Sequence, residues 1–237
     1  GALGIMIPPS IVMIIYGVLT DVSIARLFAA GVFPGLLAAG LYSGYIIVRC
    51  LANPALAPKP SRRFTWRDRF AAMLDLSPVL ILMLIVLGGI YTGVATPSEA
   101  AAVGLAATFA IMLAMRQFRW KVVVETLHSA VCLTSMIMTI VVAAAFLSAS
   151  IAYLHLPQEL TAYIRSLQMG PYMLIFILAV FYIVIGLALE GVSIFVTTLP
   201  VVFPLIVGAG FDPVWFGVFL VIMVELGTVS PPVGFKL

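Results

Sequence analysis

The strongest constraint on the fold of this chain is a series of apolar runs, several of them long enough to cross a lipid bilayer. The segment 127–153 contains no Asp, Glu, Lys or Arg, and further apolar runs occupy 33–47, 77–94 and 97–115. A helix rises about 1.5 Å per residue, so about 20 apolar residues cross the roughly 30 Å hydrocarbon layer of a membrane. The pattern predicts an all-α integral membrane protein with several spans.

Composition excludes the soluble alternatives. Of 237 residues, 64% are hydrophobic and 9% are charged, whereas soluble domains contain about 45–50% apolar and about 25% charged residues. A soluble globule of 25.4 kDa with a mean hydropathy of +1.25 would expose too much apolar surface to water. A soluble enzyme, a nucleic-acid-binding protein and a disordered chain are therefore excluded. The two cysteines form no metal-binding spacing or disulfide framework.

The basic residues predict which side of the membrane each loop faces. Nine of the twelve Lys and Arg residues lie in two stretches, 49–69 and 116–121. Basic clusters between apolar spans are typical of cytoplasmic loops, so we place both stretches in the cytoplasm. The connector 154–169 then lies on the opposite side. A separate interfacial helix is expected over 66–76, where charged and apolar residues alternate.

Two interpretations fit the apolar segment that follows the connector. Residues 171–189 and 193–209 are apolar, and Gly186–Ser193 interrupts them. Either the first run is a complete span, or the two runs are the arms of a re-entrant hairpin with its tip near 186–193. Turns at membrane depth are tolerated where they line a protein cavity. With both basic stretches in the cytoplasm, the hairpin interpretation makes the last segment of the chain cross inward, opposite to the first segment. This agreement with the repeated motif described next favours the hairpin.

A short motif occurs near both ends of the chain. Leu3-Gly4 is followed three residues later by Pro8-Pro9, and Leu226-Gly227 is followed at the same spacing by Pro231-Pro232. Gly and paired Pro residues weaken a helix and free its carbonyl groups, which need a partner such as a cation at membrane depth. The two copies are predicted to cross in opposite directions, as in the inverted repeats of secondary transporters. The alternative is that the prolines only kink two membrane helices.

These motifs also carry a resemblance. The chain resembles the large membrane subunit (DctM-like) of tripartite ATP-independent periplasmic (TRAP) transporters, in the ion transporter superfamily. The matching segments run in family order along the whole chain, at residues 1–10, 27–35, 89–102, 210–217 and 225–234. The match corresponds to the C-terminal half of such a subunit. We expect the chain to be cut at both ends, and this half alone to be unable to transport.

The resemblance implies a function and partners. It implies a sodium-coupled importer of organic acids (the dicarboxylate or sugar-acid class) that works by an elevator mechanism in the bacterial or archaeal cytoplasmic (inner) membrane. The implied partners are a small membrane subunit and a periplasmic substrate-binding protein, with sodium as the coupling ion and no other cofactor. The alternatives are an anion transporter of the same superfamily that needs no binding protein, a channel, and a membrane enzyme. Neither His128 nor His155 lies in a hydrolase motif, so we expect no enzyme activity.

The resemblance also implies site residues and domain limits. One sodium site falls on Gly186, Gly227, Ser230 and Val233, and its counterpart falls on Gly4, Ile7 and Ser10. Ser230 and Glu190 stand where the family often has Thr and Asp. The candidates for the substrate or the hairpin tip are Glu190, Gly191, Ser193 and Thr198. We expect a broken helix over 1–20, spans and interfacial helices over 21–169, and the second hairpin and second broken helix over 170–237.

Other polar residues have simpler interpretations. Glu190 is an ionisable group in a long uncharged stretch, so it is a functional candidate, with exposure to an aqueous cavity as the alternative. Glu225 precedes the second break and is expected to brace it, with pairing to a basic residue outside this chain as the alternative. Thr96 and Glu99 form a predicted helix-capping box. The three tryptophans lie where apolar spans meet polar segments, as interfacial residues do.

Overall fold

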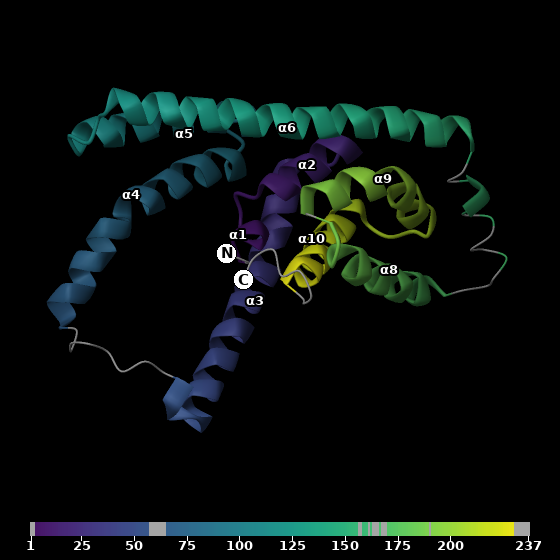
Figure 1. Cartoon of the computed structure of the whole chain (residues 1–237), viewed down its shortest axis with the longest axis horizontal. Helices are drawn as coiled ribbons and strands as arrows, with labels where there is room; N and C mark the ends of the chain where they lie inside the picture. Colours follow the sequence, from purple (N-terminus) through teal and green to yellow (C-terminus); the bar gives the residue numbers. More distant parts are fainter. Residues whose placement is uncertain are drawn as a thin grey trace. The chain divides into compact units, whose positions relative to one another are not determined.

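The computed structural model describes residues 3–56, 65–155, 158–160, 162, 166, 170–189 and 191–229. Its elements are all helical and are labelled in Figure 1: α1 (Leu3–Met6), α2 (Ile11–Thr20), α3 (Ile24–Ala52), the short 3-10 helix η1 (Pro54–Leu56), α4 (Trp66–Tyr91), α5 (Pro97–Ala114), α6 (Trp120–Tyr153), α8 (Pro171–Gly186), α9 (Gly191–Gly208) and α10 (Pro213–Val229). The all-α prediction is confirmed.

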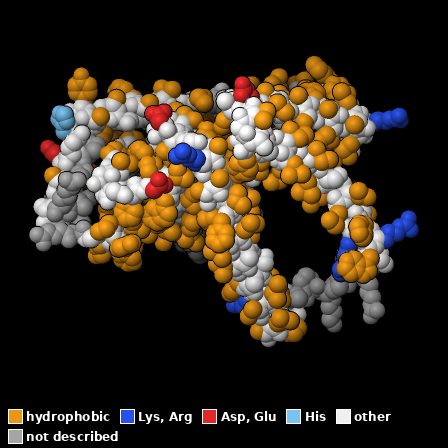
Figure 2. Space-filling view, turned by 180° about the vertical axis from the view of Figure 1, so that it is seen from behind, with side chains coloured by type: hydrophobic (Ala, Val, Ile, Leu, Met, Phe, Trp, Pro, Cys, Tyr) orange, Lys and Arg blue, Asp and Glu red, His pale blue; other side chains and the backbone are white. Residues whose placement is uncertain are grey.

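Five of the described helices are long and apolar enough to cross a membrane: α3, α4, α5, α6 and α9. Many large apolar side chains of α3, α4, α5 and α6 remain exposed on the protein, as Leu41, Leu84 and Phe146 illustrate with exposed fractions of 66%, 73% and 77%, whereas α9 is half buried. Figure 2 shows a surface dominated by hydrophobic side chains, with few charged ones. A lipid environment accounts for such a surface, since apolar groups there avoid water. The chain is a multi-pass membrane protein.

Three helices extend beyond the apolar runs that predicted them. α3 and α4 each continue through an internal proline, Pro34 and Pro78. The separate interfacial helix expected over 66–76 is therefore wrong, because those residues form the first part of α4. α6 starts at Trp120 rather than near residue 127. The physical reason is that a change from apolar to polar residues marks the edge of the lipid layer, whereas charged residues continue a helix readily.

Local capping chemistry sets where two of the helices begin. The Thr96 side chain accepts a hydrogen bond from the Glu99 amide at 3.3 Å, and the Glu99 carboxylate accepts one from the Thr96 amide at 2.8 Å. The predicted capping box of α5 is confirmed, with Pro97 in its first turn. Thr65 and Asp68 form a second box at the start of α4, which the sequence analysis did not identify. Both boxes satisfy amide groups that a helix start leaves without intrahelical acceptors.

The chain divides into two compact units, 33–120 and the combination of 1–32 with 121–237. In the first unit, α4 packs against α5, and a Cβ atom on Gly104 would lie 2.8 Å from a methyl carbon of Val86. In the second unit, α2, α8, α9 and α10 form one bundle, and α1 packs against α10 (Figure 1). Its fully buried large side chains include Tyr16, Tyr182 and Phe195. The helices that carry both copies of the sequence motif thus belong to one compact unit.

Candidate functional site

The first copy of the motif interrupts a helix. α1 ends at Met6 and α2 begins at Ile11, with Pro8-Pro9 between them. Ser10 has an extended backbone, and its hydroxyl oxygen accepts a hydrogen bond from the Met13 amide at 3.4 Å. This cap starts the second helix, as serine does at many helix N-termini.

The three residues of the first predicted sodium site lie before, within and at the end of the interruption. Gly4 lies exposed in α1, Ile7 is half-buried in the interruption, and Ser10 is buried at the start of α2. They supply backbone carbonyl groups and one hydroxyl, which are the oxygen ligands that a hard cation prefers. Their ion-binding role stays a prediction.

Two residues of the second predicted sodium site meet backbone to backbone. A Cβ atom on Gly186 would lie 2.7 Å from the Cα atom of Gly227, and one on Gly227 would lie 2.9 Å from the Cα atom of Gly186. The Cβ atom on Gly227 would also lie 3.0 Å from the Tyr182 carbonyl oxygen. No side chain larger than that of glycine fits at this crossing, so these two residues fix how closely the end of α8 approaches α10. Ser230 and Val233, the other two residues of the site, lie outside the described residues, as does Pro231-Pro232.

A buried hydroxyl pair joins the two arms of the predicted hairpin. α8 and α9 are connected through a turn at 187–189, and Glu190 lies outside the described residues. The Tyr182 hydroxyl donates to the Thr198 hydroxyl oxygen at 3.0 Å, and Thr198 donates to the Ile194 carbonyl at 2.7 Å. Thr198 is buried and held by these contacts within the hairpin. Its predicted contact with substrate is not tested by this arrangement.

The other two described hairpin-tip candidates lie in the first turn of α9. Gly191 is buried, and a Cβ atom there would lie 3.3 Å from a methyl carbon of Val224 in α10. Ser193 is half-buried. The tip is therefore packed against α10 on its Gly191 side. A helix start presents free amide groups, which favour anionic groups.

Glu225 is buried inside the bundle, with 2% of its surface exposed. It lies in α10, two residues before Gly227. The Thr228 hydroxyl donates to the Glu225 backbone carbonyl at 3.1 Å, which ties the last described turn of α10 together. An acidic side chain buried beside the predicted ion site makes this part of the bundle a candidate for function, and that role stays a prediction.

Tyr16 is a central residue that the sequence analysis missed. It is fully buried in α2, its hydroxyl donates to the Pro213 carbonyl at 2.6 Å, and its ring meets Phe195 and Phe203 edge to face. The available signal was modest. Tyr16 is the one residue with a polar side-chain group in the apolar run 11–19, and a buried tyrosine hydroxyl needs a hydrogen-bond partner.

A cavity of about 570 Å³ lies in the same compact unit, and Phe203, which contacts the Tyr16 ring, is part of its lining. Its lining comes from α2, α6 and α9 and comprises Val18, Leu19, Thr20, Val141, Ala144, Ala145, Ser148, Ala149, Ala152, Val196, Leu199, Pro200, Phe203 and Pro204. Thr20 and Ser148 are the polar side chains in this lining, and none of the predicted site residues belongs to it. The cavity is therefore a poor match for an organic acid, whose carboxylate needs charged or hydrogen-bonding partners.

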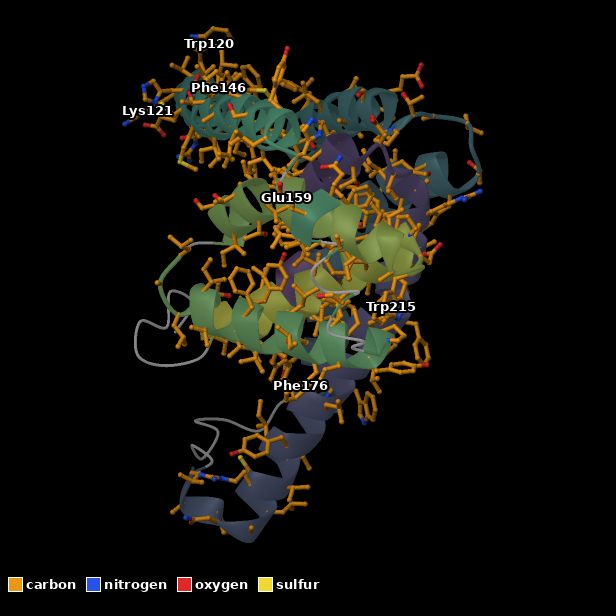
Figure 3. All side chains as sticks on the ribbon, turned by 90° about the vertical axis from the view of Figure 1, so that its right-hand side faces the viewer. Trp120, Lys121, Phe146, Glu159, Phe176 and Trp215 are labelled. Atoms are coloured by element: carbon orange, nitrogen blue, oxygen red, sulfur yellow. The ribbon has the colours of Figure 1, made fainter. Side chains whose placement is uncertain are left out.

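Each tryptophan lies in the first turn of a helix. Trp66 and Trp120 are the first residues of α4 and α6, and Trp215 lies near the start of α10. Trp120, Lys121 and Trp215 project outward in Figure 3. This distribution agrees with tryptophans at the ends of membrane spans, where the apolar ring contacts lipid and the polar N–H group contacts water. Their depth in a membrane stays a prediction.

Comparison with known proteins places this geometry in a family. The family model described as Tripartite ATP-independent periplasmic transporter, DctM component, matches residues 1–237. The chain belongs to this family. The resemblance inferred from the sequence motifs is thereby confirmed, and the family is one of transporter permeases rather than enzymes.

Named relatives of this DctM-family chain come from several bacteria. It is 34% identical to the C4-dicarboxylate TRAP transporter large permease protein DctM of Pseudomonas aeruginosa, covering 100% of this chain and 55% of that protein. It is 32% identical to the ectoine/5-hydroxyectoine TRAP transporter large permease protein UehC of Ruegeria pomeroyi, covering 97% of this chain and 53% of that protein. Identity to the sialic acid TRAP transporter large permease protein SiaM of Vibrio cholerae is 31%, covering 99% and 55%. The chain spans about half the length of these relatives.

Proposed function

We propose that this chain is part of the large membrane subunit of a TRAP transporter that imports organic acids together with sodium ions. A periplasmic binding protein delivers the substrate, a small membrane subunit completes the membrane complex, and the complex lies in the bacterial cytoplasmic membrane. Family membership over the whole chain supports this assignment. The names of three relatives include the substrates C4-dicarboxylate, sialic acid and ectoine. All three substrates carry a carboxylate, which supports the organic-acid class.

The contact between Gly186 and Gly227 is the observation that carries the sodium proposal. It brings the C-terminal end of α8 against α10. The Val184 and Ile185 carbonyls accept hydrogen bonds from amide groups of the turn at 187–189, and the carbonyl groups at such a helix end are the ones able to take a ligand from outside the helix. That end of a helix also carries a partial negative charge. Carbonyl oxygens gathered at a negative helix end favour a cation, and a hydroxyl from Ser230 would add a further ligand of the same kind.

The length of α8 supports a hairpin that enters and leaves on one side, whereas α9, with 18 residues, is long enough to cross a membrane by itself. α8 has 16 residues and spans about 24 Å, less than the roughly 30 Å hydrocarbon layer. The N-terminal end of α9 at Gly191 then lies at the hairpin tip, where its free amide groups favour a substrate carboxylate. In this proposal, the cation at the end of α8 and the anion at the start of α9 bind close together.

Shared packing supports movement of these parts as one body. Both motif-bearing helices, α1 and α10, contact each other within one compact unit. In the proposed elevator mechanism this unit slides across the membrane with sodium and substrate bound. Coupling requires that ion and substrate favour the same state of the protein.

The test is uptake by the complete transporter in vesicles. Radiolabelled C4-dicarboxylate, sialic acid and ectoine are each presented with and without the periplasmic binding protein, and with and without an inward sodium gradient. We expect one of them to accumulate only when both are present. Uptake without the binding protein would identify an independent transporter. Flux that ignores the sodium gradient and saturates only at very high substrate would identify a channel.

A further inference from the structure

We propose that Tyr16 is a positioning residue that couples the two predicted sodium sites, through the hydrogen bond that joins α2 to the start of α10. The proposal rests on the proposed function, because it concerns how the two sites act together. It does not require that Tyr16 contact an ion or the substrate.

The hydrogen bond joins two parts of the chain that are far apart in sequence. Tyr16 lies in α2 and Pro213 opens α10, and the hydroxyl-to-carbonyl distance is 2.6 Å. Tyr16 has no exposed surface. A buried hydroxyl that loses its acceptor pays a desolvation penalty, so this bond holds the two helices in one relative position.

Each of the joined helices carries one predicted site. α2 begins at Ser10, the hydroxyl candidate of the first site, about 9 Å along the helix from Tyr16. α10 carries Gly227 of the second site. α10 also contacts α1, which carries Gly4. The broken first helix therefore meets α10 on both sides of its break, and Tyr16 supplies the polar link on the α2 side.

The neighbouring helices α9 and α10 pack closely against the Tyr16 ring. A Cβ atom on Gly217 would lie 2.7 Å from Cε1 of Tyr16 and 3.0 Å from its Cδ1, so the ring packs directly on the backbone of α10. Phe195 and Phe203 of α9 meet the same ring edge to face, with centroid distances of 6.5 and 6.2 Å. Contacts with the backbone of α10 and with two aromatic side chains of α9 thus hold the Tyr16 ring in one position.

Because Tyr16 is held by these contacts, ion binding at the first predicted site affects ion binding at the second. An ion bound at the interruption before α2 fixes the start of that helix, and the Tyr16 link passes the constraint to α10. By linkage, the second site then binds its ion more tightly, and the dependence of uptake on sodium becomes steep. Packing alone would stabilise the bundle without making the two sites depend on each other.

The test uses the Tyr16→Phe variant of the complete transporter, which keeps the ring and removes the hydroxyl. Initial uptake by vesicles is measured over a range of sodium concentrations, and the thermal stability of the purified complex is measured separately. We expect the half-saturating sodium concentration to rise about three- to tenfold and the sigmoid dependence to flatten towards a hyperbola. Tyr153→Phe is the matched control, because Tyr153 is 90% exposed at the end of α6, and its sodium curve should equal that of the wild type.

Gly217→Ala is the second variant, because its added methyl group would press on the Tyr16 ring and, equally closely, on the Leu27 side chain. It should flatten the sodium curve in the same way, and the double variant should be no flatter than either single variant. An unchanged sodium curve in both single variants, beside a sodium-dependent wild type, would overturn the coupling and leave the proposed function standing. A lowered melting temperature with unchanged steepness would assign Tyr16 to packing alone. A wild type without sodium dependence would overturn the proposed function itself.

Discussion

At the scale of single residues, two glycines decide how the hairpin meets the second motif helix. Gly186 and Gly227 bring two backbones into direct contact, and any side chain there would need the helices to separate. Close approach of this kind is how small residues pack membrane helices. It also lets carbonyl groups of α8 reach the part of α10 where the resemblance predicts an ion.

Replacing Gly227 by alanine should therefore destabilise the bundle. Its Cβ atom would lie 2.9 Å from a backbone carbon of Gly186, and overpacking costs about 1–3 kcal/mol. Thermal unfolding of the purified subunit in detergent measures this cost. Gly44→Ala in α3 is the matched control, since nothing lies within 4 Å of its added Cβ atom. It should be neutral or stabilising by up to about 1 kcal/mol. Equal melting temperatures for Gly227→Ala and wild type would contradict the tight crossing.

The buried hydroxyl pair of the hairpin predicts an asymmetry between two substitutions. Tyr182→Phe removes one bond and leaves Thr198 bonded to the Ile194 carbonyl, so it should cost about 0.5–1.5 kcal/mol. Thr198→Val leaves the Tyr182 hydroxyl without this acceptor, so it should cost about 1–3 kcal/mol. Melting of the two variants and of the double variant gives both values. Greater loss in Tyr182→Phe than in Thr198→Val would show that the pair is arranged differently.

At the scale of helices, local chemistry sets several starts and one interruption. Ser10 caps α2 after the Pro8-Pro9 break, and Thr96 with Glu99 caps α5. The Pro8-Pro9 break and the Thr96–Glu99 box were predicted from the sequence because the responsible residues lie within three positions of one another, whereas the capping role of Ser10 was not predicted. The same logic assigns Glu99 to helix initiation rather than to transport.

Substitutions of Glu99 test that assignment. Glu99→Gln keeps an acceptor for the Thr96 amide and should leave stability and uptake close to those of the wild type. Glu99→Ala removes it and should lower the melting temperature, with little change in the sodium dependence of uptake. A loss of uptake in Glu99→Gln, with normal melting, would instead place the charge of Glu99 in the transport cycle.

The features that were not readable from the sequence depend on distant contacts. The extents of α3, α4 and α6 were underestimated because polarity marks the lipid boundary and not the helix end. The family resemblance assigned Gly186 and Gly227 to one predicted sodium site, but their backbone contact was not predicted, since no local pattern pairs these residues. The Tyr16–Pro213 bond joins positions 197 residues apart, so only the folded bundle reveals which carbonyl the buried hydroxyl meets.

At the scale of the whole molecule, the apolar surface and the family membership both indicate a lipid membrane as the environment of the protein. Five described helices are suited to crossing a membrane, and the DctM family model matches the chain from residue 1 to 237. The compact unit that contains both motif helices holds the predicted sodium residues described by the structure. In the proposed function, ion binding, substrate binding and movement all belong to this unit.

The most direct test of this account is sodium entry driven by substrate. Vesicles that contain the complete transporter, without an imposed sodium gradient, are mixed with radioactive sodium and substrate-loaded binding protein. Because coupling is reciprocal, an imposed substrate gradient should drive sodium into the vesicles, and Gly227→Leu and Ser230→Ala should weaken or abolish that entry. Sodium entry that is the same with and without substrate would contradict sodium-coupled transport by this chain.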